Sequence, residues 1–143
     1  MTVHRMMYTS LAIKNMLKPD LYIILRKARI NNKTADITGL LVYVDNIFLQ
    51  ILEGNRTEVL KLFSTISKDP RHTEVKIIHE DEAEKRVFPS WQMAYASPSA
   101  KELATWSGLN STTTLQDTLE AMNKEPSRIS EVLSKLLEQA ADT

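Results

Sequence analysis

Short strand-like runs alternate with helical stripes over roughly the first hundred positions of the chain. Alternation of apolar and polar residues predicts strands over residues 3–9, 37–44, 48–54, 75–79 and 90–96. The dipeptide Asp45-Asn46 lies between the second and third of these runs, and it has the length and composition of a two-residue hairpin turn. Five strands, two of them joined by this hairpin, are therefore expected.

Two helices are expected between the strands. The first begins near Pro19 and carries apolar residues at helical spacing: Leu21, Ile24, Leu25 and Ala28. Asn31 and Asn32 continue this stripe, so the inward side of the helix changes from hydrocarbon to amide at its end. One asparagine is interpreted as a C-terminal cap, because asparagine tolerates the left-handed conformation there, and the other is left to explain. The second helix, over residues 57–68, has inward Val59, Leu60, Phe63 and Ile66.

The order strand, helix, strand, strand, helix, strand predicts an α+β fold of the ferredoxin-like βαββαββ type, here with a fifth strand. Both helices should cover one face of the sheet. From Pro98 onward the pattern is helical, with helices expected over residues 99–108, 114–123 and 127–141. We expect this C-terminal helical extension on the opposite sheet face or at a subunit contact, and its long apolar stripe predicts a homo-oligomer.

Composition narrows the class of protein. With 143 residues a single domain is expected, divided here into residues 1–97 and an output or oligomerisation extension, residues 98–143. Lysine plus arginine and aspartate plus glutamate number 18 each, so no net field attracts nucleic acid or anionic lipid. Cysteine is absent, and no apolar run approaches the ~20 residues of a membrane span. We expect a soluble, cytoplasmic protein whose partners are small molecules or proteins.

Several catalytic chemistries lack their residues. The three glycines do not have the spacing of a phosphate-binding loop, the three histidines are too scattered for a metal site, and no serine has the surroundings of a nucleophile. We therefore expect no enzyme and no metal. An acylphosphatase-like hydrolase has the same fold and stays an alternative, with Arg71 and Asn31 or Asn32 on a phosphate.

One carboxamide, Gln50, stands in the middle of the apolar run over residues 48–54. If Gln50 is buried, each polar group of its amide that stays unpaired costs about 1–3 kcal/mol. The alternative is that Gln50 lies at a sheet edge and bonds water or backbone. The predicted fold directs further polar groups into the gap between the two helices: Tyr8, Asn31, Asn32, Arg71 and His72. Carboxamides and a phenol among apolar residues suit a flat heteroaromatic ligand. Arg71 and His72 could meet its charged tail, or could form a solvated turn.

These residues resemble the BLUF family of blue-light sensors, which bind flavin between the two helices of a ferredoxin-like fold. The resemblance covers residues 1–97 and is carried by these motifs: Tyr8-Thr9-Ser10, Asn31-Asn32, Ile37-Thr38-Gly39-Leu40-Leu41, Phe48-Leu49-Gln50-Ile51-Leu52-Glu53-Gly54, Asp69 with Arg71-His72, and Phe88 with Trp91 and Met93. Each motif is short, but they occur in the family's order and spacing. Ala28 departs from members that have serine there, which removes one possible polar contact.

The resemblance implies which residues hold the flavin. Gln50 would bond the N5 and C4-carbonyl edge of the ring. Asn32 would bond its C4-carbonyl and N3 side, and Asn31 its C2 carbonyl or the ribityl region. The full set implied to bind the cofactor is Tyr8, Ile24, Ala28, Asn31, Asn32, Phe48, Gln50, Ile66, Asp69, Arg71, His72 and Met93. FAD is expected, with FMN or riboflavin possible because the recognised edge is common to all three.

The resemblance also implies a photochemical switch. Light would draw an electron and a proton from Tyr8 through Gln50, and Gln50 would then rotate or tautomerise and bond the flavin more strongly. Trp91 or Met93 lies beside Gln50 in the family, and the sequence leaves open which. The fifth strand and the C-terminal helices would pass the change to an unidentified downstream signalling protein. A colourless regulatory module of the same fold remains a second alternative.

Overall fold

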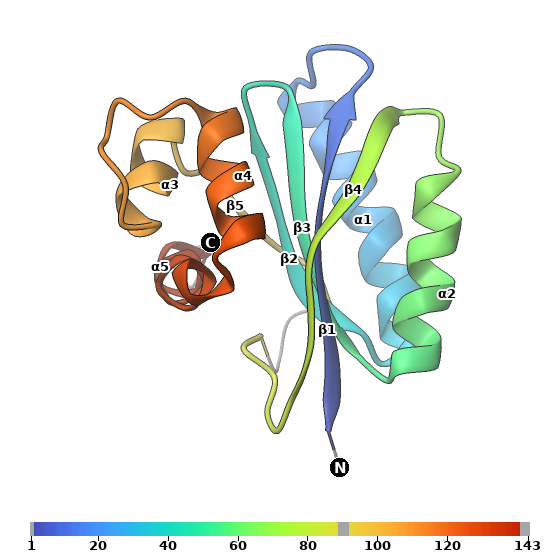
Figure 1. Cartoon of the computed structure of the whole chain (residues 1–143). Coiled ribbons are helices and arrows are strands. Elements are labelled where there is room, and N and C mark those ends of the chain that lie inside the picture. Colours follow the sequence, from blue (N-terminus) through green and yellow to red (C-terminus); the bar gives the residue numbers. More distant parts are fainter. Residues whose placement is uncertain (1, 89–91, 141–143) are drawn as a thin grey trace.

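The computed structural model describes residues 2–88 and 92–140, which form one mixed sheet between two helical layers (Figure 1). The strands have the order β4-β1-β3-β2-β5. The elements are β1 Val3–Ala12, α1 Lys18–Ala35, β2 Thr38–Val44, β3 Ile47–Gly54, α2 Arg56–Ser67, β4 His72–Ala83, β5 Ala94–Ala96, α3 Ala100–Trp106, α4 Leu115–Lys124, a 3-10 turn Pro126–Arg128 and α5 Ile129–Ala140.

The topology is that of the predicted ferredoxin-like fold. Strand β1 pairs antiparallel with β3 and β4, β2 pairs antiparallel with β3, and the added β5 lies parallel to β2 at the sheet edge. Asp45 and Asn46 have φ angles of 47° and 69°, as a tight two-residue hairpin between β2 and β3 requires. Asn55 caps α2 by accepting a hydrogen bond from the backbone N–H of Thr57 at 2.9 Å.

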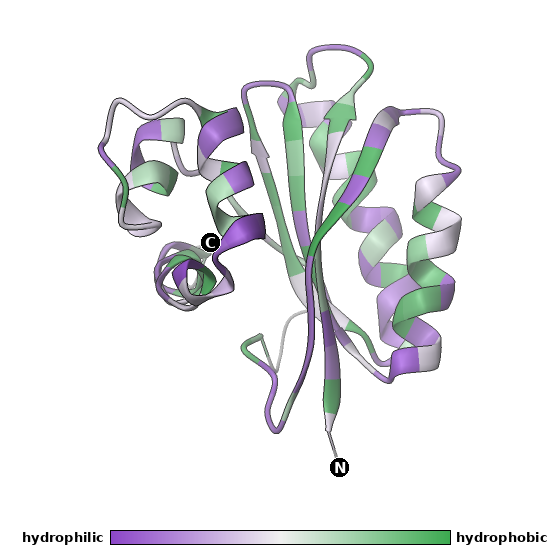
Figure 2. Cartoon of the chain, viewed as in Figure 1, coloured by the Kyte–Doolittle hydropathy of each residue, from purple (hydrophilic) through white to green (hydrophobic). Residues whose placement is uncertain are grey.

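The alternation along β3 decides what each sheet face packs against. Phe48, Gln50 and Leu52 face α1 and α2, whereas Leu49 and Ile51 face the C-terminal helices. Both faces are therefore apolar, and the central strands are largely green in Figure 2 while the helices alternate between green and purple. This explains why the strand sequences read as nearly continuous hydrophobic runs.

The C-terminal helices occupy the sheet face opposite α1 and α2 (Figure 1). The apolar stripe of α5 is buried there by the sheet and by α3 and α4, and Val132 and Leu136 have no exposed surface. The first of the two predicted placements is thus confirmed. Oligomerisation stays a prediction, and it loses the exposed stripe on which it was based.

Several predicted boundaries are wrong. Helix α1 continues to Ala35 and ends at Asp36, whose φ is 54°, so neither Asn31 nor Asn32 is a cap. Strand β4 continues past the predicted residues 75–79 through Asp81, because Arg5 on the neighbouring β1 binds the Asp81 carboxylate at 2.9 Å. The predicted fifth strand over residues 90–96 is shortened to Ala94–Ala96 within the described residues.

The segment between β4 and β5 is fixed to β3 by a buried carboxylate. Glu53 is fully buried, and its two oxygens accept hydrogen bonds from the backbone N–H groups of Val87 and Phe88, each at 2.8 Å. The guanidinium of Arg86 donates to the hydroxyl of Thr38 at 3.0 Å. These contacts hold residues 86–88 against the sheet. None of the helices in the described residues is long and apolar enough to cross a bilayer.

Candidate functional site

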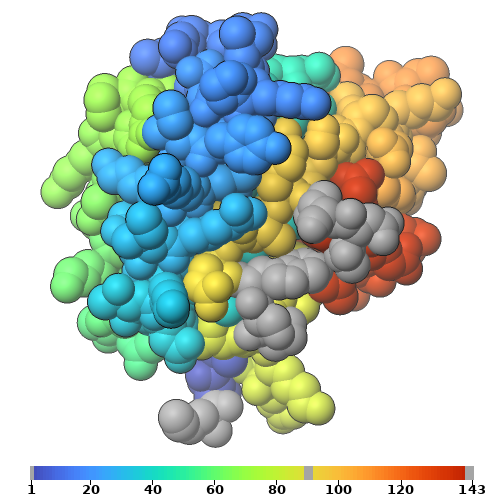
Figure 3. All heavy atoms as spheres, turned by 180° about the vertical axis from the view of Figure 1, so that it is seen from behind, coloured from blue at the N-terminus to red at the C-terminus, as the bar shows by residue number. Residues whose placement is uncertain are grey.

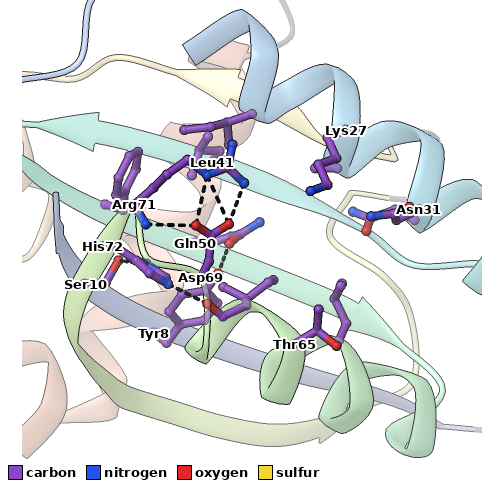
Figure 4. A pocket seen from close by; sticks show the side chains of 16 residues that line it. Tyr8, Ser10, Lys27, Asn31, Leu41, Gln50, Thr65, Asp69, Arg71 and His72 are labelled. Carbon is purple, nitrogen blue, oxygen red and sulfur yellow. Dashed lines mark hydrogen bonds and ion pairs between the residues drawn. The ribbon is translucent and has the colours of Figure 1, made fainter. Parts of the chain in front are cut away.

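A cavity that opens to solvent on one side lies between α1, α2 and the sheet. Figure 4 shows Lys27 and Asn31 on α1, Thr65 on α2 and Tyr8 and Gln50 on the strands around it. The cavity is lined by every residue predicted to bind a cofactor except Met93, namely Tyr8, Ile24, Ala28, Asn31, Asn32, Phe48, Gln50, Ile66, Asp69, Arg71 and His72. The fold thus gathers side chains that are up to sixty-four positions apart in the chain.

Tyr8 and Gln50 form a buried hydrogen-bonded pair at the sheet side of the cavity. They are direct cross-strand neighbours on β1 and β3, with 1% and 7% of their surfaces exposed. The phenol O–H of Tyr8 donates to the side-chain carbonyl Oε1 of Gln50 (Figure 4). Burial, with a smaller effect of the Asp69 carboxylate, raises the pKa of Tyr8 well above its ordinary value. Tyr8 is therefore a neutral phenol whose proton already points at Gln50, and the sheet-edge interpretation of Gln50 is wrong.

Met93 lies on the other side of Gln50. The amide Nε2 of Gln50 is 3.5 Å from the sulfur of Met93, which is 2% exposed. Two side chains of α1 hold the backbone here: Arg29 donates to the carbonyl of Met93 at 2.8 Å, and Asn32 to the carbonyl of Gln92 at 2.5 Å. Trp91, the other predicted neighbour of Gln50, lies outside the described residues.

Asn32 supplies an unused acceptor to the cavity. Its side chain is 1% exposed, and although Nδ2 is bonded to Gln92, its Oδ1 has no hydrogen-bond partner among the described residues. A buried acceptor without a partner costs about 1–3 kcal/mol. Asn31 lines the same wall but is exposed. A ligand with an N–H group would satisfy this oxygen. Such a ligand would also explain why the apolar stripe of α1 ends in an asparagine that is not a cap.

Asp69 and Arg71 satisfy each other at one end of the cavity. Arg71 donates through its backbone N–H and Nε to Oδ1 of Asp69, at 2.9 and 3.0 Å, and through Nη2 to Oδ2 at 2.5 Å. These bonds lower the pKa of Asp69 to about 2. Because two of the three guanidinium nitrogens of Arg71 bind Asp69 in this way, the arginine is held in an ion pair, which counts against the acylphosphatase-like alternative.

His72 is fixed by two hydrogen bonds. Its Nε2 lies 2.6 Å from the backbone carbonyl of Ile66, which only accepts, so Nε2 carries a proton. Its Nδ1 lies 2.7 Å from the hydroxyl of Ser10 (Figure 4). The ring contacts Phe48 edge-on, with 6.5 Å between centroids. His72 is thus part of the wall of the cavity, and the interpretation of a solvated turn is wrong.

Five lining residues were not predicted: Ser10, Lys27, Leu41, Leu62 and Thr65. Helical spacing could have found Lys27, three positions after Ile24, and strand alternation could have found Ser10, which shares the face of Tyr8. Leu41 lies opposite Gln50 in the register between β2 and β3, which follows from the hairpin. No group of three or more potential metal ligands occurs in the part of the chain that the structure describes.

Comparison with known proteins gives a consistent result. The family model described as "Sensors of blue-light using FAD" matches residues 3–94. Photoactivated adenylate cyclase subunit beta of Euglena gracilis is 36% identical over 123 residues, which are 86% of this chain and 14% of that protein. The chain therefore spans about one seventh of that relative's length.

Solved structures show the same fold over nearly the whole chain. BlsA in its ground state has a TM-score of 0.79 and 30% identity, with 94% of this chain and 87% of that chain covered. BlrB, described as a BLUF protein in its dark state, has a TM-score of 0.73 and 28% identity, and the match covers 96% of both chains. The match includes α3, α4 and α5, so the helices after β5 belong to the shared architecture.

Proposed function

Because this chain belongs to the BLUF family, the sensors of blue light using FAD, we propose that it is a photoreceptor that holds a flavin non-covalently between α1 and α2. One observation carries the proposal: a buried chain of contacts runs from the phenol of Tyr8 through Gln50, both of which line the cavity, to the sulfur of Met93 behind it. The absence of cysteine excludes a cysteinyl adduct and supports a non-covalent site.

The residues present fit a flavin. The unpartnered Oδ1 of Asn32 suits the ring N–H between two carbonyls, and Gln50 offers an amide to the adjacent edge. Ile24, Ala28 and Ile66 supply apolar walls for a flat ring system. We assign FAD as the cofactor, with FMN or riboflavin as possible substitutes. Asp69, Arg71 and His72 are bonded to protein groups, so they shape the end of the cavity.

Tyr8 and Gln50 perform the switch. When bound and excited by blue light, the flavin supplies a strong one-electron oxidant. Tyr8 is neutral, so it loses its electron together with its proton, and the proton moves along the existing hydrogen bond to Oε1 of Gln50. An electron and a proton then return to Tyr8. If Oε1 gives back the proton it received, Gln50 is left rotated; if Oε1 keeps that proton and Nε2 gives up one of its own instead, Gln50 is left as the imidic-acid tautomer. Because the former partners of a buried amide lose their hydrogen bonds, the rearrangement changes the free energy of the neighbouring groups by on the order of 1–3 kcal/mol.

Met93 transmits the change. A rearranged Gln50 no longer presents Nε2 to the sulfur of Met93, which alters the start of β5. Ala94 and Ala96 of β5 pack in the same core as α3, α4 and α5, which gives a route to the opposite face of the sheet. We propose that residues 1–97 are the photosensory part and residues 98–143 the output part, acting on a separate downstream protein.

A sensory role is preferred to a catalytic one. The cyclase activity in the names of the Euglena relatives belongs to proteins of which this chain matches about one seventh. The cavity residues described here offer an amide switch and no metal cluster or free nucleophile. We therefore assign no enzymatic activity to these 143 residues, and we propose a cytoplasmic location.

A light-minus-dark absorption spectrum tests the function. The purified protein should be yellow, and blue light should shift its flavin bands reversibly to the red. Gln50→Leu should bind flavin without the shift, and Tyr8→Phe should lose the normal photocycle. Tyr43→Phe is the matched control, because the Tyr43 hydroxyl bonds Met16 and Asn46 away from the cavity. A normal shift in Gln50→Leu, or a protein that cannot be reconstituted with flavin, would refute the assignment.

A further inference from the structure

Large exposed hydrophobic residues are concentrated in one stretch of the chain. Among the described residues, five of the six lie within positions 13–30, and the sixth is Ile77 on β4 with 37% exposed. The three on α1 are Tyr22, Ile23 and Ile30, with 69%, 62% and 62% exposed. Figure 3 shows this part of the chain, in blue, running over the surface on the side away from the C-terminal helices. A cluster of this kind typically marks an interaction site.

The spacing puts these residues on one side of α1. At 100° per residue, one sector of about 100° holds Tyr22, Ile23, Arg26, Ile30 and Lys33 and excludes the buried stripe of Leu21, Leu25 and Asn32; the five residues are termed the outer face of α1. Arg26 and Lys33 lie between Tyr22 on one flank and Ile23 and Ile30 on the other. The cations are thus central in the patch, and the apolar residues flank them.

The charge of α1 has no counterpart within the described structure. The helix contains five cationic residues and one carboxylate, in a chain whose net charge is zero. Its carboxylate, Asp20, is 3.9 Å from Lys14, which precedes the helix. The five cationic residues form no ion pair with any described carboxylate: Lys18, Arg26, Lys27, Arg29 and Lys33.

We propose that the outer face of α1 docks an acidic amphipathic helix of a partner protein. The apolar residues would bury leucine-type side chains of the partner, and its carboxylates would neutralise Arg26 and Lys33. A symmetric contact with a second copy would bring the same cations together, which opposes it. A lipid surface accepts a helix with an apolar centre and cations at the rim, whereas here burial in lipid would desolvate the central Arg26.

The same helix forms a wall of the cavity. Ala28, Asn31 and Asn32 line it, and Arg29 and Asn32 hold the backbone beside Met93. A partner on the outer face is therefore one helix away from the Gln50 switch. That the docked partner receives a light signal rests on the proposed function, whereas the docking surface itself does not.

Two synthetic helices test the docking. One carries leucines at i, i+3, i+4 and i+7 with glutamates between them, and its twin has lysine in place of every glutamate. Binding of each labelled peptide to the flavin-loaded protein is measured by fluorescence anisotropy, in darkness and under blue light. We expect the acidic peptide to bind, the basic twin not to bind, and amide shifts on binding to map to residues 18–35. Failure of both peptides to bind, or equal binding of both, would overturn the proposal.

Surface variants locate the site. Ile23→Ser with Ile30→Ser, and separately Arg26→Glu, should each weaken binding of the acidic peptide roughly tenfold or more. The matched controls, Ile77→Ser and Lys61→Glu, should bind as the wild type does. An unchanged affinity in the isoleucine double variant would overturn the proposal.

Two further results would assign the face to another occupant and overturn the proposal. One is co-sedimentation with phosphatidylserine-containing vesicles that the isoleucine double variant loses while it still binds the peptide. The other is a dimer in analytical ultracentrifugation that the same variant abolishes. The light-minus-dark spectrum of each sample reports separately on the proposed function, because peptide binding in darkness needs no photoreaction.

Discussion

Replacing Glu53 with glutamine tests how the segment that leads to Met93 is held. The two side chains have the same shape, so the substitution leaves no cavity and changes only charge and hydrogen bonding. Glu53 uses both oxygens, Oε1 for the N–H of Phe88 and Oε2 for the N–H of Val87. A glutamine has one oxygen, and its NH₂ group would face an N–H that also donates. One of the two bonds is therefore lost.

The magnitude follows from these contacts. A hydrogen bond to a charged acceptor contributes about 1.5–3 kcal/mol, and the remaining bond weakens when its acceptor becomes neutral. A neutral amide is less costly to bury than a carboxylate, which offsets part of the loss. Arg5, 3.6 Å from Glu53, keeps its pair with Asp81. We expect Glu53→Gln to lower the free energy of unfolding by roughly 2–4 kcal/mol.

Urea denaturation followed by far-UV circular dichroism measures this change. Glu84→Gln is the matched control, because Glu84 is exposed in the same segment, and it should change the free energy of unfolding by no more than about 0.5 kcal/mol. If Glu53→Gln were as stable as the control, with the same dependence on urea, the carboxylate would not hold this segment and the reasoning would be wrong.

Three further predictions concern the mouth of the cavity, the sheet and the C-terminal helices. Arg71 lowers the pKa of Asp69 from 3.8 to about 2. The ionised carboxylate therefore stabilises the folded state fully above pH 3.8, and this contribution is lost as the pH falls through about 2. Acid titration of Asp69→Asn should show a smaller loss of stability over that interval than the wild type, and an equal loss would contradict the pairing. Gly39→Ala should lower the free energy of unfolding by roughly 2 kcal/mol or more or prevent folding, because a Cβ there would clash with the Ile51 carbonyl oxygen; a stable variant in urea denaturation would refute this. Leu136→Ala should cost about 2–5 kcal/mol in one transition seen alike by circular dichroism and flavin release, whereas two separate transitions would mean that the C-terminal helices fold independently.

Local patterns in the sequence account for most of the fold. The alternation around Gln50, the Asp45-Asn46 turn and the helical stripes each depend on near neighbours in the chain, so the element order and the 4-1-3-2 arrangement with an added strand could be predicted. The polar residues predicted around the gap followed from that order, because the inner strands and the ends of both helices converge there, whereas Asp69 was implied only by the family resemblance. Element ends were less predictable, since pairing with Arg5 extends β4 through Asp81.

The tertiary structure decided which polar groups are satisfied and which are available. The sequence pattern placed Asn32 and Arg71 in one region, and the family resemblance added Met93 or Trp91. Neither revealed that Arg71 is paired with Asp69, that Oδ1 of Asn32 has no partner in the described residues, or that Met93 touches Gln50. It also offered two places for the C-terminal helices, and packing on the sheet selected one. Periodicity tells which side of an element is apolar, whereas the partner of a side chain depends on distances between elements, which only the folded chain fixes.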